Sequence, residues 1–157
     1  MNTIQEAKDF IVKNSRDGVR CPCCAQFVKI YKRPLNSMMA KQLILIYRWF
    51  VANPGEQWVH ASQFLTHVRA VSGGECAKLR FWGLIDEAAA ALPTNGAKHH
   101  GLYAITDLGR DFVLCKVRVP KYIFLYNQNC MGLSDTDTTS IQEALSTKFD
   151  YATLMNS

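Results

Sequence analysis

A chain of 157 residues is about the size of one domain, long enough for a single core and short for two independent ones. Hydrophobic residues make up 48% and charged residues 20%, which excludes a largely disordered chain. The formal net charge is +5: up to Trp82 twelve Lys and Arg stand against five acids, and from Gly83 onward six stand against eight. A basic first half favours a polyanionic partner such as nucleic acid, and a solvated surface kept for solubility is the alternative.

The sequence also argues against a membrane-spanning or secreted protein. The best apolar run, Leu43 to Ala52, is interrupted by Arg48 and falls short of the roughly 20 residues that cross a bilayer. The first ten residues carry early acids and lack an apolar signal region. We therefore expect a cytoplasmic protein whose six cysteines are thiols or metal ligands before disulfides.

Residues 1–36 predict a helix and a cysteine-containing β-hairpin. Asn2 or Thr3 can cap the helix, and Glu6 fits a capping box with Thr3. After the cysteines, the alternating segment from Phe27 to Arg33 indicates a strand.

Cys21-x-x-Cys24 lies on the predicted hairpin turn and has two interpretations. Two thiolates separated by two residues can coordinate one tetrahedral ion, as in one knuckle of a zinc ribbon. A closed zinc site needs four ligands, however, and no second Cys-x-x-Cys or His-x-x-x-His follows. We therefore favour cysteines that behave as small buried hydrophobes, and keep zinc bound by Cys21 and Cys24 as the alternative.

Residues 37–115 predict a helical scaffold and a hairpin. Asn36 or Ser37 begins the strongest helix, Met38 to about Ala52, which is apolar over much of its circumference and must be central. Trp58-Val59 predicts a short strand, and a second helix begins at His60 or Ser62. His60 is expected to act as a cap or a surface residue rather than a ligand.

The stretch from Ser72 to Cys115 predicts a further helix, a hairpin with a basic loop, and a capped helix. Glu75 to Trp82 is a short amphipathic run that ends on Gly83-Leu84-Ile85. The second strand runs from Gly101 to Ile105, and Thr106 or Asp107 can cap the helix that follows.

This order, with Leu79 before Gly83-Leu84-Ile85 and with the motif Tyr103-Ala104-Ile105-Thr106-Asp107-Leu108-Gly109, resembles the winged helix-turn-helix superfamily. The second motif is similar to the exit of the wing in MarR-type and PadR-type regulators. The resemblance covers about half of the chain, roughly Ser37 to Val113. Two departures are an unusually aromatic recognition helix, with Phe81 and Trp82, and the shortness of that helix.

The resemblance implies DNA contacts by outward side chains of the recognition helix and by the wing. Lys78 and Arg80 are the predicted base readers, since Arg is the usual reader of guanine. The other predicted nucleic-acid-binding residues are Lys41, Arg69, Lys98, His99 and His100.

Residues 116–133 predict a C-terminal strand, and residues 134–157 a flexible tail with a short helix. Pro120 places the strand at a sheet edge or at a break between two strands. Its expected partner is the Phe27 to Lys32 strand, with pairing to a second subunit as the alternative. The predicted fold class is therefore α+β, a winged helix-turn-helix core with an extra small β-sheet built from the N-terminal hairpin and a C-terminal strand.

The sequence shows no catalytic constellation, and we expect no enzyme. The first hypothesis is a double-stranded DNA-binding protein, a small bacterial or phage transcriptional regulator that binds best as a homodimer. The second is a winged-helix protein-protein interaction module, an adaptor or inhibitor without specific DNA binding. A buried Phe81 with projecting Lys78 and Arg80 favours DNA, whereas an exposed Phe81 favours a protein partner.

Overall fold

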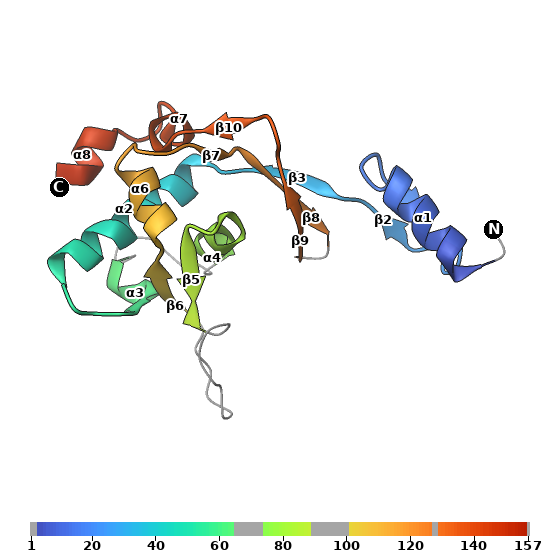
Figure 1. Cartoon of the computed structure of the whole chain (residues 1–157), viewed down its shortest axis with the longest axis horizontal. Helices are drawn as coiled ribbons and strands as arrows, with labels where there is room; N and C mark the ends of the chain where they lie inside the picture. Colours follow the sequence, from blue (N-terminus) through green and yellow to red (C-terminus); the bar gives the residue numbers. More distant parts are fainter. Residues whose placement is uncertain (1–2, 65–73, 89–100, 127–128, 157) are drawn as a thin grey trace, which may run out of the picture.

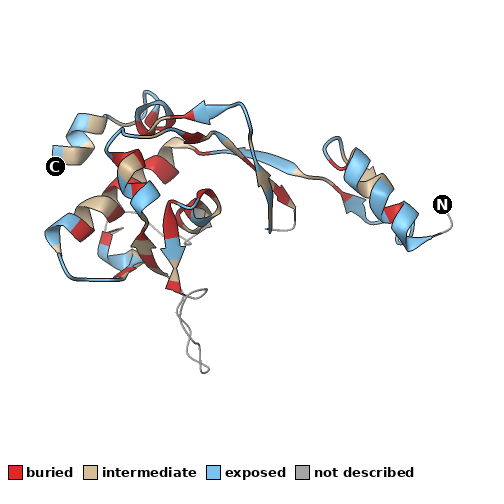
Figure 2. Ribbon diagram, viewed as in Figure 1, coloured by how far each residue is buried: buried red, intermediate tan, exposed pale blue. Residues whose placement is uncertain are grey.

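The structure, a computed structural model, describes residues 3–64, 74–88, 101–126 and 129–156. Residues 3–30 form an N-terminal unit that stands apart from the rest of the chain (Figure 1). Its elements are α1 (Ile4–Asn14), β1 (Val19–Arg20) and β2 (Phe27–Val28). Strand β3 (Tyr31–Pro34) joins this unit to a body, built around α2 (Ser37–Ala52), that holds most of the buried residues (Figure 2).

The predicted N-terminal helix and its cap are confirmed. The Thr3 side chain accepts from the Glu6 backbone N–H at 3.1 Å, and the Glu6 carboxylate accepts from the Thr3 N–H at 3.2 Å. The strand predicted from Phe27 to Arg33 is instead two short strands, because the Ile30 N–H donates to the Ser15 carbonyl and turns the chain between β2 and β3.

Helix α2 is the centre of the body, as its apolar sequence predicts. The Asn36 side chain caps it by accepting from the Met39 N–H at 2.9 Å. Leu43, Ile44 and Ile46 are fully buried, and α2 contacts helices α3, α4, α6, α7 and α8 as well as β4 and β6. Among the described residues, no helix combines the length and apolarity needed to cross a membrane.

The body carries a three-stranded antiparallel sheet in the order β4-β6-β5. Its elements, in chain order, are β4 (Val59–His60), α3 (Ala61–Phe64), α4 (Gly74–Ala77), η1 (Lys78–Trp82), β5 (Ile85–Glu87), β6 (Leu102–Ile105) and α6 (Asp107–Val113). The His60 ring accepts from the Ser62 N–H at 3.1 Å, so His60 caps α3 as predicted. In this sheet β6 is the central strand: β4 pairs with one edge of it, and β5 pairs with the other to form a hairpin.

Thr106 ties the beginning of α6 to the end of η1. Its hydroxyl accepts from the Gly109 N–H at 3.0 Å and donates to the Gly83 carbonyl at 2.6 Å. Gly83 itself has φ of 75°, a left-handed conformation that suits glycine at the end of a helix. The two sequence motifs behind the predicted resemblance therefore meet at one junction.

The single helix predicted from Glu75 to Trp82 is divided. Only Gly74–Ala77 is α-helical, and Lys78–Trp82 is a 3-10 helix. The Gly83 N–H donates back to Arg80 and Leu79, which tightens the last turn. The tighter turn changes the angular spacing of Lys78 and Arg80 from that of an α-helix.

A second three-stranded sheet, in the order β3-β8-β9, lies between the N-terminal unit and the body (Figure 1). Strand β8 (Tyr122–Tyr126) pairs with β3, with Tyr31 opposite Leu125, and with β9 (Asn129–Leu133). The predicted pairing of the N-terminal and C-terminal strands is confirmed. Ile123 and Leu125 of β8 are buried, whereas Tyr122, Phe124 and Tyr126 on the other face are half-buried.

The C-terminal segment differs from the predicted flexible tail. Strand β10 (Thr138–Thr139) pairs with β7 (Val119–Pro120), and helices α7 (Ile141–Leu145) and α8 (Tyr151–Asn156) contact α2. Ile141 and Leu145 are buried in the core, and the Tyr151 hydroxyl donates to the Val113 carbonyl at 2.6 Å. The serine and threonine residues of this segment form strand β10 and the cap of α7 rather than a mobile linker.

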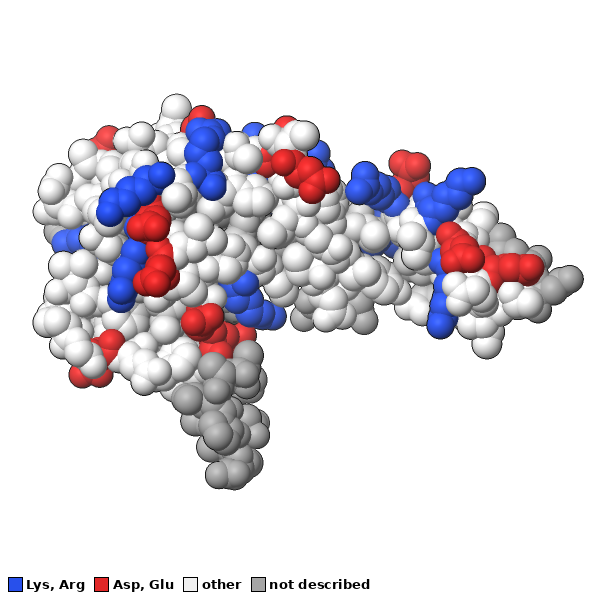
Figure 3. Space-filling view, in the orientation of Figure 1, with Lys and Arg blue, Asp and Glu red and all other residues white. Residues whose placement is uncertain are grey.

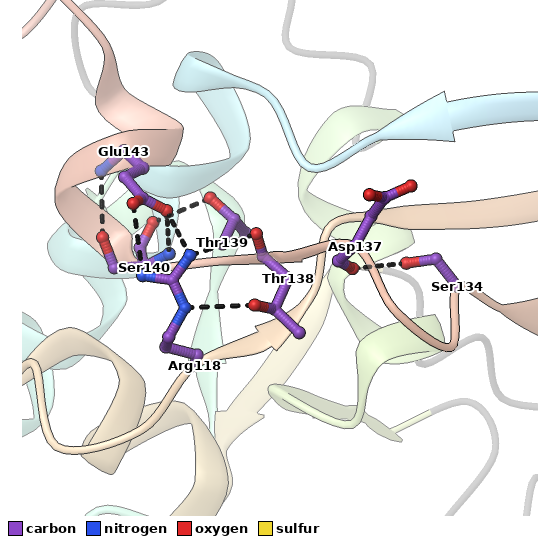
Figure 4. Close-up of polar contacts among 7 residues, drawn as sticks. All are labelled: Arg118, Ser134, Asp137, Thr138, Thr139, Ser140 and Glu143. Atoms are coloured by element: carbon purple, nitrogen blue, oxygen red, sulfur yellow. Dashed lines mark hydrogen bonds and ion pairs between the residues drawn. The ribbon is translucent and has the colours of Figure 1, made fainter.

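Arg118 holds this segment through a polar cluster (Figure 4). Its guanidinium donates to both carboxylate oxygens of Glu143, at 2.7 and 3.2 Å, and to the side chain and carbonyl of Thr138. The Glu143 carboxylate also accepts from the Ser140 N–H in a capping box. These bonds, above all the one from Arg118, hold the pKa of Glu143 below its ordinary value of 4.5.

Replacing Glu143 with Gln should lower stability at neutral pH but not in acid. Glutamine keeps the capping box and removes the charge that Arg118 binds. The pKa of Glu143 is lower in the folded protein than in the unfolded chain. The ion pair therefore contributes its full stabilisation at pH values above the unfolded-state pKa, and this stabilisation is lost as the pH falls through the folded-state pKa.

Thermal unfolding at pH 7 and at pH values below 4.5 checks this. The difference in Tm between the wild type and Glu143→Gln should shrink in acid. Glu56→Gln, which removes a carboxylate from an exposed turn, is the control and should show no such trend. An equal difference at every pH would contradict a role for the charge.

Candidate nucleic-acid interface

Arg80, the first predicted base reader, is exposed but turned toward the protein. Its guanidinium forms an ion pair with Glu87 on β5 at 3.1 Å, donates to the Ala77 carbonyl at 3.2 Å, and lies 4.6 Å from the centre of the Phe81 ring. The side chain of Arg80 is 38% exposed and that of Glu87 17%. The Arg80 guanidinium is the more accessible partner of this pair, so a phosphate or base that reaches it has to compete with the half-buried Glu87 carboxylate.

Lys78 lies at the start of η1 and is half-buried, and it has an interaction within the chain. Phe81 is half-buried and packs against the core, while Trp82 is only 3% exposed. The Trp82 indole N–H donates to the Pro120 carbonyl at 2.7 Å. The aromatic character of this element thus has a structural cause, because Trp82 connects it to β7.

The remaining predicted contacts are not brought together with Lys78 and Arg80 in the part of the chain that the structure describes. Lys41 lies on α2 with its ammonium 4.7 Å from the centre of the Phe149 ring. Arg69, Lys98, His99 and His100 lie outside the described residues. The described residues therefore include three of the seven predicted contacts, Lys78 and Arg80 on η1 and Lys41 on α2.

Most of the net charge belongs to the first 36 residues rather than to the body. Seven Lys and Arg stand there against three acids, a net of +4, whereas from Ser37 onward eleven stand against ten. On the face shown in Figure 3, cationic and acidic side chains lie beside one another over the body. A comparison of the net charge of residues 1–36 with that of the remaining residues reveals this imbalance, whereas a comparison that divides the chain after Trp82 does not.

Cations and aromatic rings alternate on and near the β3-β8-β9 sheet. The Lys32 ammonium lies 4.0 Å from the ring centre of Tyr122, and that of Lys121 5.4 Å from the same ring. The Arg16 guanidinium lies 5.0 Å from the ring centre of Phe124. Exposed lysine and arginine beside half-buried rings form a surface that suits a phosphate backbone. Sequence reasoning expected phosphate contacts from the basic first half of the chain but did not single out Arg16, Lys32 or Lys121.

The Cys21 and Cys24 side chains are brought together by the turn between β1 and β2. Hydrogen bonds from the backbones of Cys24 and Cys23, followed by weaker ones from their side chains, lower the pKa of the Cys21 thiol. Cys21 is half-buried and Cys24 is exposed, which contradicts our preferred interpretation of these cysteines as buried hydrophobes. Among the described residues, no cluster of three or more His, Cys, Asp or Glu could hold a metal ion.

Two other titratable groups, Cys76 and Tyr103, are buried in the core. Burial, with a smaller contribution from Glu87, raises the pKa of the Cys76 thiol to about 12. Burial also raises the pKa of Tyr103 to about 12. At neutral pH both groups are uncharged, which is typical of packing residues rather than of nucleophiles or ligands.

Comparison of the chain with protein-family models, with curated proteins and with solved structures gives no match.

Proposed function

We propose that the protein binds double-stranded DNA through a winged helix-turn-helix body, with the N-terminal unit and β3 adding phosphate contacts. The observation that carries the proposal is the strand order β4-β6-β5. Helix α2 precedes the first strand, α3, α4 and η1 follow it, and β5 with β6 forms the hairpin that a wing requires. This order agrees with the one that the sequence motifs around Gly83 and Gly109 imply.

The distribution of charge supports the same proposal. The N-terminal unit and β3 carry the cations Arg16, Lys29, Lys32 and Arg33, in the part of the chain with a net charge of +4. Phosphate contacts supply affinity and register but no sequence information. Sequence reading falls to Lys78 and to Arg80, once the latter leaves Glu87. A small bacterial or phage transcriptional regulator fits this division, on the strength of the resemblance.

Removing β3 cations is expected to weaken DNA binding in a salt-dependent way. The log of the binding constant for a duplex falls with log salt by roughly 0.9 for each phosphate neutralised. The double variant Lys32→Ala, Arg33→Ala should therefore reduce that slope by about 2. Fluorescence anisotropy of a labelled mixed-sequence duplex, titrated at several salt concentrations, measures it.

The matched control is Lys116→Ala, Lys148→Ala, which removes two exposed cations from the body and should leave the slope unchanged. Lys78→Ala, Arg80→Ala should abolish preference for a selected site, with a modest fall in Tm because Glu87 loses its partner. Absence of binding by the wild type at low salt would overturn the proposal.

A second candidate function is a protein-protein interaction module on the same scaffold. The observation that favours it is the ion pair of Arg80 with Glu87, because it turns a predicted base reader back onto the sheet. If Glu87→Gln, which releases Arg80, fails to raise affinity for the duplex, the ion pair does not compete with DNA. That result together with no wild-type binding would favour this candidate.

A further inference from the structure

The turn that carries the N-terminal cysteines has a fixed backbone. The Cys21 N–H donates to the Gln26 carbonyl and the Ala25 N–H to the Cys21 carbonyl, both at 2.8 Å. Ala25 is left-handed, with φ of 61°, and its carbonyl accepts from the Arg20 guanidinium at 3.1 Å. An alanine holds this conformation only where the surroundings impose it. The turn is therefore preorganised with the Cys21 and Cys24 thiols close together.

The N-terminal unit has little apolar core of its own. Its buried residues are Ala7, Ser15 and Val28, whereas Ile4 is 71% exposed, Val12 77% and Phe27 53%. Units below about 40 residues usually need a disulfide, a metal or a partner chain for stability. Figure 1 shows the unit projecting from the body, and its main contacts are among α1, β1 and β2. This unit needs an additional source of stability.

A tetrahedral zinc ion would meet that need, but the turn supplies only half of the ligands. Structural zinc takes four ligands, and two thiolates at this spacing can share one ion. In the described part of the chain no further His, Cys, Asp or Glu completes the set with them. The turn belongs to the N-terminal unit, which projects from the body (Figure 1), so a second copy of the same turn is a source for the two missing ligands.

We propose that Cys21 and Cys24 bind a Zn²⁺ ion together with Cys21 and Cys24 of a second copy of the chain, so that the metal joins two N-terminal units. Four thiols lose their protons to solvent as four Zn–S bonds form, which leaves a dianionic centre. The net charge of +4 on the first 36 residues of each copy complements that charge.

Zinc content and molecular mass test the proposal on the full chain. The protein is kept reduced with a phosphine, loaded with Zn²⁺ and freed of excess metal. We expect one zinc ion per two chains and a mass twice the 17.7 kDa of one chain. A chelator should remove the zinc and halve the mass. A monomer, with or without zinc, or a dimer that keeps its mass after chelation, would overturn the proposal.

Serine variants locate the ligands. Cys21→Ser and Cys24→Ser should each lose both zinc and dimer, whereas Cys23→Ser, in the same turn, should keep both. Loss in all three variants, or in none, would overturn the assignment. Where a variant fails to fold, Co²⁺ in the wild type counts the thiolates through its sulfur-to-metal absorption, and fewer than four per ion would overturn it. None of these measurements involves DNA, so they stand apart from the proposed function.

Discussion

Replacing Gly109 with alanine is expected to destabilise the protein by about 3 kcal/mol, the upper part of the range for overpacking a core. A Cβ at this position would overlap the Leu84 carbonyl oxygen and lie 2.9 Å from Ile105 Cγ1. The Leu84 carbonyl cannot move away easily, because it accepts from the Thr106 N–H at 3.1 Å. Alanine normally stabilises a helix relative to glycine, so the expected sign is opposite to the usual one.

Chemical denaturation measures the free energy of unfolding for this comparison. Arg110→Ala, at the exposed neighbouring position of α6, is the control and should stay within about 0.5 kcal/mol of the wild type. A loss below about 1 kcal/mol for Gly109→Ala would mean that α6 moves away from β5 at little cost.

Trp82→Ala should cost about 3–5 kcal/mol, the range for truncating a large buried aromatic side chain. Trp82 is 3% exposed, and its indole N–H donates to the Pro120 carbonyl. The substitution therefore leaves a cavity in the core and also releases β7 from η1. We expect the C-terminal segment to become more susceptible to proteolysis in this variant, because β7 pairs with β10.

Trp82→Phe separates the two contributions. It keeps most of the buried ring and removes the donor, which should cost about 1–3 kcal/mol for the unpaired carbonyl. Phe81→Ala, at the half-buried neighbour, is the matched control and should cost less than Trp82→Ala. If Trp82→Phe and Trp82→Ala were equally destabilised, the hydrogen bond and not the packing would dominate.

The sequence correctly predicted those helices and caps that depend only on residues close to them in the chain. The central helix, its Asn36 cap and the Thr106 cap are confirmed because a cap residue and an apolar face act over a few residues. The mixed α+β composition also agrees with the structure. The division of the predicted helix into α4 and η1 was not predicted, because Gly83, whose N–H donates back to η1, is also held by Thr106, a residue distant in the sequence.

The C-terminal segment and the state of Arg80 could not be predicted for a related reason. Polar residues such as Thr138 and Ser140 are common in mobile linkers. Here Thr138 accepts from Arg118, twenty residues away, and Ser140 forms a capping box with Glu143, whose carboxylate also accepts from Arg118. Arg80 meets Glu87 because β5 returns beside η1. Sequence patterns predict which face of a helix or strand is buried, but they do not predict which side chain from a distant part of the chain will contact it.

The pairing of β3 with β8 determines when the chain can complete its fold during synthesis. Tyr31 pairs with Leu125, so β3 has left the ribosome long before its partner exists. At ordinary elongation rates the delay is roughly 5–20 s. Through that time the N-terminal unit and its three neighbouring thiols are attached to an unpaired strand edge. The N-terminal unit, although it is made before the body, is thus fixed in place only after β8 has been made.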